Sequence, residues 1–163
     1  MMVADAIRTK RAVRQFTDQP VPDEQIRAIL HAGRRAQSSK NGQPWTFIVI
    51  RDRETLGQLS TCGGYAGHLA GAAFAVALVS SVSYSFDLGQ AAAYMQLAAW
   101  ELGVGSCIAS MWEPERAGAI LGVPPDHLFD TAISFGYAAA PLTTSSKPGG
   151  RRTLDEVVRW EHW

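Results

Sequence analysis

The chain has 163 residues, of which 15 are basic and 15 are acidic, so its formal net charge at pH 7 is zero. This length suits one domain that buries its own core, although chains of this size often complete their core by pairing with a second copy. Zero net charge gives no general attraction to nucleic acid or to an anionic membrane surface. Any anion must therefore be recognised by a local cluster of cations.

The cysteines and the apolar runs exclude further classes. Cys62 and Cys107 lie far apart and lack the spacing of a zinc site or of a disulfide framework, and no two histidines stand at metal-ligand spacing. The N-terminus lacks the pattern of a signal peptide, and the apolar run over 69–79 is too short to span a membrane. We therefore expect a soluble, cytoplasmic protein with no bound metal and no nucleic-acid or membrane partner.

Hydrophobic periodicity and turn residues predict an alternation of helices and strands. In chain order we expect a helix over 3–9, a helix over 22–33, a strand over 47–50, a helix over 53–60, a strand over 72–80, a helix over 86–102, a small-residue segment over 103–112, a helix over 114–121 and a strand over 129–135.

The first candidate site is a basic cluster at or just beyond the end of the first predicted helix, formed by Lys10, Arg11 and Arg14. Such a cluster can be a solvated turn that favours the helix dipole. It can also bind a phosphate, because arginine offers a planar fork of donors and lysine adds a point charge. The cluster by itself favours the first interpretation.

The second candidate is the polar loop over 37–45, which combines hydroxyls, amides, a glycine and a proline before an apolar strand. It is either an ordinary turn or a binding loop held by rigid elements. A glycine-rich segment over 61–71 follows later but carries neither a Gly-Lys-Ser/Thr ending nor a GxGxxG pattern. We predict that this segment is loosely held or shapes the surface, and that it is a candidate flap on the substrate side.

The C-terminal half contains a third candidate. The segment over 103–112 is rich in small residues, so it is either an interior strand or a wall where a planar ligand meets backbone amides. Cys107 within it is more simply a core residue than a nucleophile. Residues 141–150 are expected to be an exposed connection. Trp160 and Trp163 are expected to dock on the body of this subunit or of a partner, because large apolar side chains are costly to leave in water.

Four motifs together resemble the nitroreductase family of FMN-dependent flavoproteins. They are Arg8-Thr9-Lys10-Arg11-Ala12-Val13-Arg14-Gln15-Phe16, Ser38-Ser39-Lys40-Asn41-Gly42-Gln43-Pro44-Trp45-Thr46-Phe47, Glu101-Leu102-Gly103-Val104-Gly105-Ser106-Cys107 and Arg151-Arg152-Thr153-Leu154-Asp155-Glu156-Val157-Val158. The resemblance implies an α+β fold with three α/β/α layers and a mostly antiparallel central sheet. It also implies an intertwined homodimer with FMN at each of two interface sites. Residues 1–163 would form one domain, with 141–163 as a C-terminal arm that packs on the partner subunit.

The resemblance also implies which residues bind the cofactor. The phosphate would be held by the segment Lys10, Arg11, Ala12 and Arg14 together with Arg151 or Arg152. Gln37, Ser38, Ser39 and Asn41 would reach the flavin from the other subunit, and the backbone of Ile108, Ala109, Ser110 and Met111 would face its N5 and O4 edge. Ala12 and Gln37 depart from the serine and proline usual in the family, and the segment over 58–71 is shortened.

The implied activity is a ping-pong reaction in which NAD(P)H reduces FMN and a small acceptor such as a nitroaromatic or a quinone then reoxidises it. No side chain need act as an acid or base. Alternatives within the fold are reductive dehalogenation, flavin fragmentation, azo reduction or use of a deazaflavin. A flavin- or anion-binding module without turnover is a further alternative. The preference between NADH and NADPH and the physiological acceptor stay open.

Overall fold

The protein is organised around an antiparallel sheet. A computed structural model describes residues 2–83, 86–141 and 150–163. Within this part of the chain the four strands lie in the order β1-β2-β4-β3, and every neighbouring pair is antiparallel. The strands are β1 (Trp45–Ile50), β2 (Phe74–Ser80), β3 (Gly105–Ser110) and β4 (Leu128–Gly136). The predicted antiparallel sheet is confirmed, with the second strand starting two residues later than expected.

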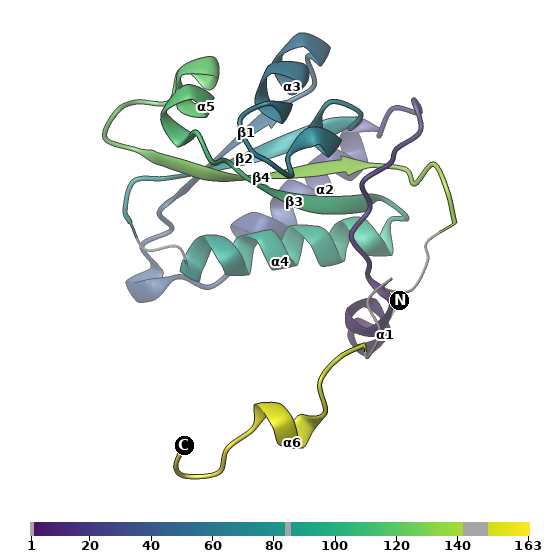
Figure 1. Cartoon of the computed structure of the whole chain (residues 1–163), viewed down its shortest axis with the longest axis vertical. Helices are drawn as coiled ribbons and strands as arrows, with labels where there is room; N and C mark the ends of the chain where they lie inside the picture. The colour runs from purple at the N-terminus through teal and green to yellow at the C-terminus, as the bar shows by residue number, and fades with distance from the viewer. Residues whose placement is uncertain (1, 84–85, 142–149) are drawn as a thin grey trace.

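Helices cover both faces of this sheet (Figure 1). One face carries α3 (Arg53–Ser60), η2 (Gly67–Leu69) and α5 (Pro114–Leu121), and the other carries α2 (Asp23–Arg34) and α4 (Phe86–Glu101). Strand β2 is buried on both sides, which explains its unbroken run of apolar and small residues. The predicted three-layer α/β/α architecture is therefore confirmed.

The side chains of β2 alternate between two cores. Ala75, Ala77 and Val79 pack with the α3 and α5 layer. Phe74 and its neighbours on the opposite face of the strand pack with the α2 and α4 layer. Because successive residues of a strand point to opposite faces, one short strand supplies both cores. No helix of the described ranges is both long and apolar enough to cross a membrane.

The two ends of the chain lie outside this body. Helix α1 (Val3–Thr9) lies below the sheet edge in Figure 1, and the segment with α6 (Leu154–Val157) projects away from the rest of the molecule. Trp160 and Trp163 are 83 % and 105 % exposed. Within one chain, neither tryptophan docks on the body of its own subunit, which was one of the two predicted docking sites. The predicted connection over 141–150 falls mostly outside the described residues.

The glycine-rich segment over 61–71 corrects a prediction. Instead of being loosely held, it contains η2 and completely buries Cys62, Ala66 and Leu69 beneath the α3 and α5 layer. Its glycines suggested freedom, but Gly63 serves close packing against Ser110 of β3. The prediction of a loosely held segment is therefore wrong, and the first turn of this segment supports the end of β3.

Candidate functional site

The N-terminal basic segment lies against the edge strand β3. Ala12 and Ser106 form a parallel bridge, and the Val13 N–H donates a 3.0 Å hydrogen bond to the Ser106 carbonyl. Gly105 makes this approach possible, because a Cβ at that position would lie 2.5 Å from Cγ2 and 2.7 Å from Cβ of Val13. The basic segment is thereby held in a defined position beside β3, as an extended chain and not as a solvated turn.

Two of the three predicted cations converge on the same strand. Both Lys10 and Arg14 act electrostatically on the Cys107 thiol of β3. Burial lowers the pKa of half-buried Lys10, and Cys107 acts weakly in the opposite direction. In the described part of the chain neither Lys10 nor Arg14 forms an ion pair with a carboxylate. A partly buried cation without a counter-ion is costly, so this position favours an anionic ligand.

The other two residues of the basic segment lie differently. The Arg11 guanidinium turns back and donates to the carbonyls of Arg8 and Lys10, each at 2.9 Å, at the end of α1. Ala12 contributes its backbone to the bridge with β3 and has no hydroxyl to offer. Both line one side of a cavity of about 230 Å³ that also contains Arg14 and Pro141. Arg14 thus lines this cavity and also lies close enough to Cys107 to act on its thiol.

The outer edge of β3 offers backbone donors. Every second residue of a strand directs its backbone N–H and C=O to the same neighbouring side. The Ser106 carbonyl faces Val13, away from β4, so the N–H and C=O groups of Ile108 and Ser110 also face away from β4. Neither of them makes a backbone hydrogen bond beyond the sheet within the described residues. The Met111 N–H, by contrast, donates to Asp130 at 2.8 Å, and Ala109 is paired with β4. Of the four predicted flavin-facing residues, two therefore keep outward amides and two are occupied in the sheet.

A histidine that the sequence did not single out lies at the same place. His68 of η2 is only 9 % exposed, and its Nδ1 lies 2.8 Å from Oγ of Ser134 on β4. The Ser134 hydroxyl donates in turn to the Cys107 carbonyl at 3.2 Å. The other ring nitrogen, Nε2, is buried and has no hydrogen-bond partner among the described residues. No local pattern in the sequence marks this residue, because its partners are contributed by distant strands.

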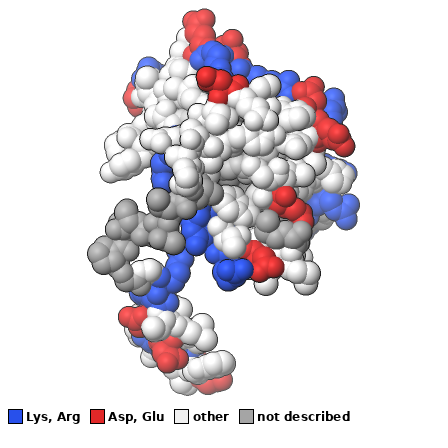
Figure 2. Space-filling view, turned by 90° about the vertical axis from the view of Figure 1, so that its right-hand side faces the viewer, with Lys and Arg blue, Asp and Glu red and all other residues white. Residues whose placement is uncertain are grey.

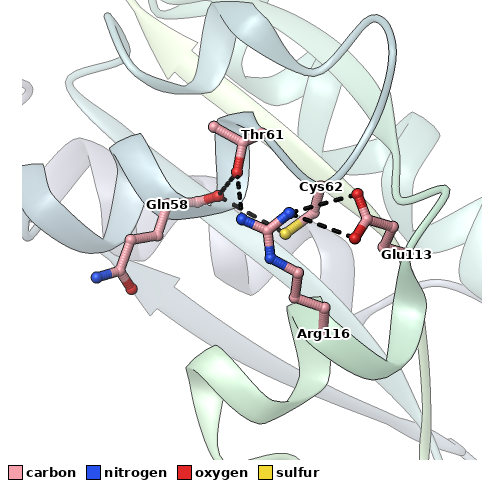
Figure 3. A network of polar contacts seen from close by, with 5 residues as sticks. All are labelled: Gln58, Thr61, Cys62, Glu113 and Arg116. Carbon is pink, nitrogen blue, oxygen red and sulfur yellow. Dashed lines mark hydrogen bonds and ion pairs between the residues drawn. The ribbon is translucent and has the colours of Figure 1, made fainter.

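The turn over 61–64 supports the end of β3. The N–H groups of Trp112 and Glu113 donate to the Cys62 carbonyl at 2.8 and 3.0 Å. Arg116 of α5 donates to Thr61 at 2.9 Å and pairs with Glu113 at 3.3 Å, which links α3 to α5 around this turn (Figure 3). These contacts fix the backbone that follows Ser110, where the sequence predicted flavin-facing amides.

The close fit at this turn requires two glycines. A Cβ on Gly63 would overlap the Ser110 carbonyl oxygen, and one on Gly64 would overlap the Trp112 ring. Trp112 in turn meets the exposed Tyr65 edge to face, with 5.8 Å between ring centroids. The glycine-rich segment therefore sets the position of the edge strand.

The polar loop does not join Lys10 and Arg14 within one chain. Its 3-10 turn η1 (Ser39–Asn41) lies at the start of α4, whereas α1 lies near the end of α4 (Figure 1). Asp87 accepts a 3.0 Å hydrogen bond from the Ser39 N–H, and Gln90 donates to the Gln37 carbonyl at 3.3 Å. Within the loop the Ser38 hydroxyl accepts a hydrogen bond from the Gln43 N–H at 3.0 Å. The loop is ordered, but it does not reach this site within one chain.

Arg151 and Arg152 are exposed on the C-terminal segment. On the face drawn in Figure 2, Lys and Arg side chains gather where the body meets this segment. One chain therefore brings together Lys10, Arg14 and the edge of β3, while the loop lies at the other end of α4.

Comparisons with known proteins show what this chain is similar to. The family model described as "Nitroreductase family" matches residues 7–75 and 62–137. An Archaeoglobus fulgidus protein provisionally named NADH dehydrogenase/NAD(P)H nitroreductase is 34 % identical over 143 residues, which cover 80 % of this chain and 82 % of that protein. A Thermus thermophilus protein named NADH dehydrogenase is 26 % identical over 93 % of this chain and 92 % of its own length.

A solved structure shows the same architecture. The structure of an FMN-dependent nitroreductase from Clostridium difficile R20291 superimposes with a TM-score of 0.87 and 27 % identity, and the match covers 97 % of this chain and 98 % of that one. Over nearly the whole length, the fold of this chain is thus the fold of that enzyme.

Proposed function

This chain belongs to the nitroreductase family, and we propose that it is an FMN-dependent NAD(P)H oxidoreductase that reduces small acceptors, such as nitroaromatics or quinones, by ping-pong hydride transfer. One observation carries the proposal. Half-buried Lys10 and nearby Arg14 have no carboxylate partner in the described chain, and they lie beside a strand edge with outward-facing amides. This combination suits a ligand with a phosphate at one end and a planar polar ring at the other.

The residues present fit FMN. Lys10 and Arg14 would hold the phosphate, and the outward N–H groups of Ile108 and Ser110 would donate to the polar edge of the ring. We propose that Gln37, Ser38, Ser39 and Asn41, with Arg151 or Arg152, complete the site from a second copy. FMN, when bound, would supply the redox chemistry, with NAD(P)H as the hydride donor.

The chain itself would bind and orient FMN and would stabilise its negative charge. Fixed donors and cations stabilise negative charge best when they are already in place, and the support of β3 by the Gly63 turn provides such rigidity. The buried Cys107 thiol has its pKa raised by burial, against weaker opposing effects of Arg14 and Lys10, so it stays a neutral thiol. Both cysteines are buried and unpaired, which is compatible with the cytoplasm that we propose as the compartment.

We propose a homodimer because the C-terminal segment exposes a large apolar surface that its own subunit does not cover. Replacing both Trp160 and Trp163 with alanine should weaken dimerisation at least about 30-fold, since buried tryptophans at interfaces commonly contribute about 2 kcal/mol or more. Sedimentation equilibrium measures this change. Leu128→Ala, at an exposed apolar position on β4, is the matched control and should leave the dimer intact. A strictly monomeric wild-type protein would contradict the proposal.

The function is tested by the visible spectrum of the purified protein after incubation with FMN, before and after anaerobic NADH or NADPH. We expect a yellow protein that bleaches with NAD(P)H and recovers its colour when a nitroaromatic or a quinone is added. A protein that cannot be loaded with FMN would overturn the proposal. A yellow protein that never bleaches would indicate a flavin-binding module without turnover, and recovery only with halogenated substrates would indicate dehalogenation.

A further inference from the structure

The hydrogen bonds around His68 determine where its proton lies. The Ser134 hydroxyl donates its hydrogen to the Cys107 carbonyl, so the Ser134 oxygen must accept from Nδ1–H of His68. In the neutral imidazole the proton then lies on Nδ1 and the free lone pair on Nε2. In the described part of the molecule this buried lone pair receives no hydrogen bond. Buried polar atoms are rarely left in this condition without a function or a missing ligand.

The groups around the ring favour its neutral form. Burial lowers the pKa of His68, the backbone of Ile108 acts in the opposite direction, and the positive charge of Arg14 lowers it further. Lys10 and the Cys107 thiol lie next in this cluster, and no carboxylate is found there among the described residues. Negative charge arriving near Arg14 would therefore raise the pKa of His68, because it offsets the positive charge that lowers it.

We propose that His68 takes up one proton from solvent when FMN bound in this site receives a hydride, and releases it when the flavin is reoxidised. This inference rests on the proposed function. The hydride brings both electrons from NAD(P)H, leaving NAD(P)⁺ and a reduced flavin with one added negative charge. A bond forms between Nε2 and the incoming proton, and the imidazolium balances that charge. The nearby Ile108 backbone favours the protonated ring.

The consequence is a pH-dependent flavin potential. For a two-electron couple, each proton taken up changes the equilibrium tenfold per pH unit, which is about 30 mV. Hydride uptake alone gives one such step, and protonation of His68 adds a second. The midpoint potential should therefore fall by about 60 mV per pH unit between the pKa of His68 in the oxidised protein and its pKa in the reduced protein, and by about 30 mV outside that range.

Redox titration of the FMN-loaded protein between pH 5 and 9 tests this, with wild type compared with His68→Gln. We expect a steeper segment in the wild type that is absent from His68→Gln, because glutamine can still hydrogen-bond Ser134 but does not titrate. His127→Gln is the matched control, since His127 lies next to Asp126 at the beginning of β4 and outside this site. Equal slopes in wild type and His68→Gln would overturn the inference and leave the proposed function standing.

A second measurement does not depend on turnover or on the stability of the glutamine variant. NMR of histidine-labelled protein should show His68 neutral with oxidised FMN and protonated with reduced FMN near neutral pH. In Ser134→Ala, Nδ1 of His68 loses its hydrogen-bond partner, and the ring nitrogen signals of His68 should show a different tautomer. An unchanged protonation state on reduction would contradict the inference. Failure to bind FMN at all would instead contradict the proposed function.

Discussion

Replacing Arg14 with glutamine is expected to weaken FMN binding by about 10- to 100-fold, because hydrogen bonds to charged groups contribute about 1.5–3 kcal/mol. Arg14 reaches both the cavity beside Pro141 and the Cys107 side of the site, and it has no carboxylate partner in the described chain. Removing it should therefore leave a ligand phosphate with half-buried Lys10 and with Arg11, whose guanidinium already donates to two backbone carbonyls. Quenching of flavin fluorescence during titration measures the dissociation constant.

Arg8→Gln provides the matched control for this experiment. Arg8 lies on the same N-terminal segment but is exposed and pairs with Asp5 at 3.0 Å on α1. Its replacement should leave FMN affinity within about twofold of wild type, as expected for an exposed ion pair. Equal affinities of wild type and Arg14→Gln would show that the basic segment does not hold the phosphate.

Replacing Gly63 with alanine is expected to destabilise the protein and to impair the site at the same time. The added methyl would overlap the Ser110 carbonyl, a backbone atom that cannot swing aside as a flexible side chain can. Overpacking of this kind costs about 1–3 kcal/mol. For a domain of this size the melting temperature should fall by about 2–12 °C. FMN affinity should fall as well, because the displaced backbone carries the outward amide of Ser110.

Gly67→Ala separates this steric effect from the general effect of losing a glycine. Gly67 lies in the same glycine-rich segment, but a Cβ there would meet nothing within 4 Å. Its replacement should leave the melting temperature unchanged or slightly raised, because alanine restricts the unfolded chain. Thermal unfolding of both variants without flavin, followed by FMN titration, makes the comparison. A Gly63→Ala protein as stable as Gly67→Ala would contradict the close packing described for this turn.

Much of the architecture could be predicted because it depends on local patterns. The apolar run of β2 indicated a strand covered on both faces, and the two cores on either side of it confirm that prediction. The three- and four-residue spacing in 86–102 predicted α4, which ends one residue earlier, at Glu101. The family motifs predicted the three-layer fold, which the structure and the comparisons confirm. These features require only the period of the hydrophobic residues and the residues that begin or end an element.

The site was predicted only in part, because it depends on contacts between distant segments. The basic cluster alone favoured a solvated turn, and only its bridge with Ser106 shows that it lies along β3. Glycines at 63 and 64 were interpreted as freedom, whereas they allow two backbones to approach each other. A glycine has the same letter in a mobile loop and in a tight contact, and only the neighbouring atoms distinguish the two.

The sequence by itself determined the succession of helices and strands, the zero net charge and the motifs of the family. Those properties are local or additive along the chain. The tertiary structure alone decided that Lys10 and Arg14 meet at Cys107, and that the orphaned nitrogen of His68 lies beside them. His68 and Ser134 are 66 residues apart and become neighbours only because η2 packs against β4. A ring nitrogen becomes buried without a hydrogen-bond partner only when residues from several elements surround it, and this happens only once the chain has folded.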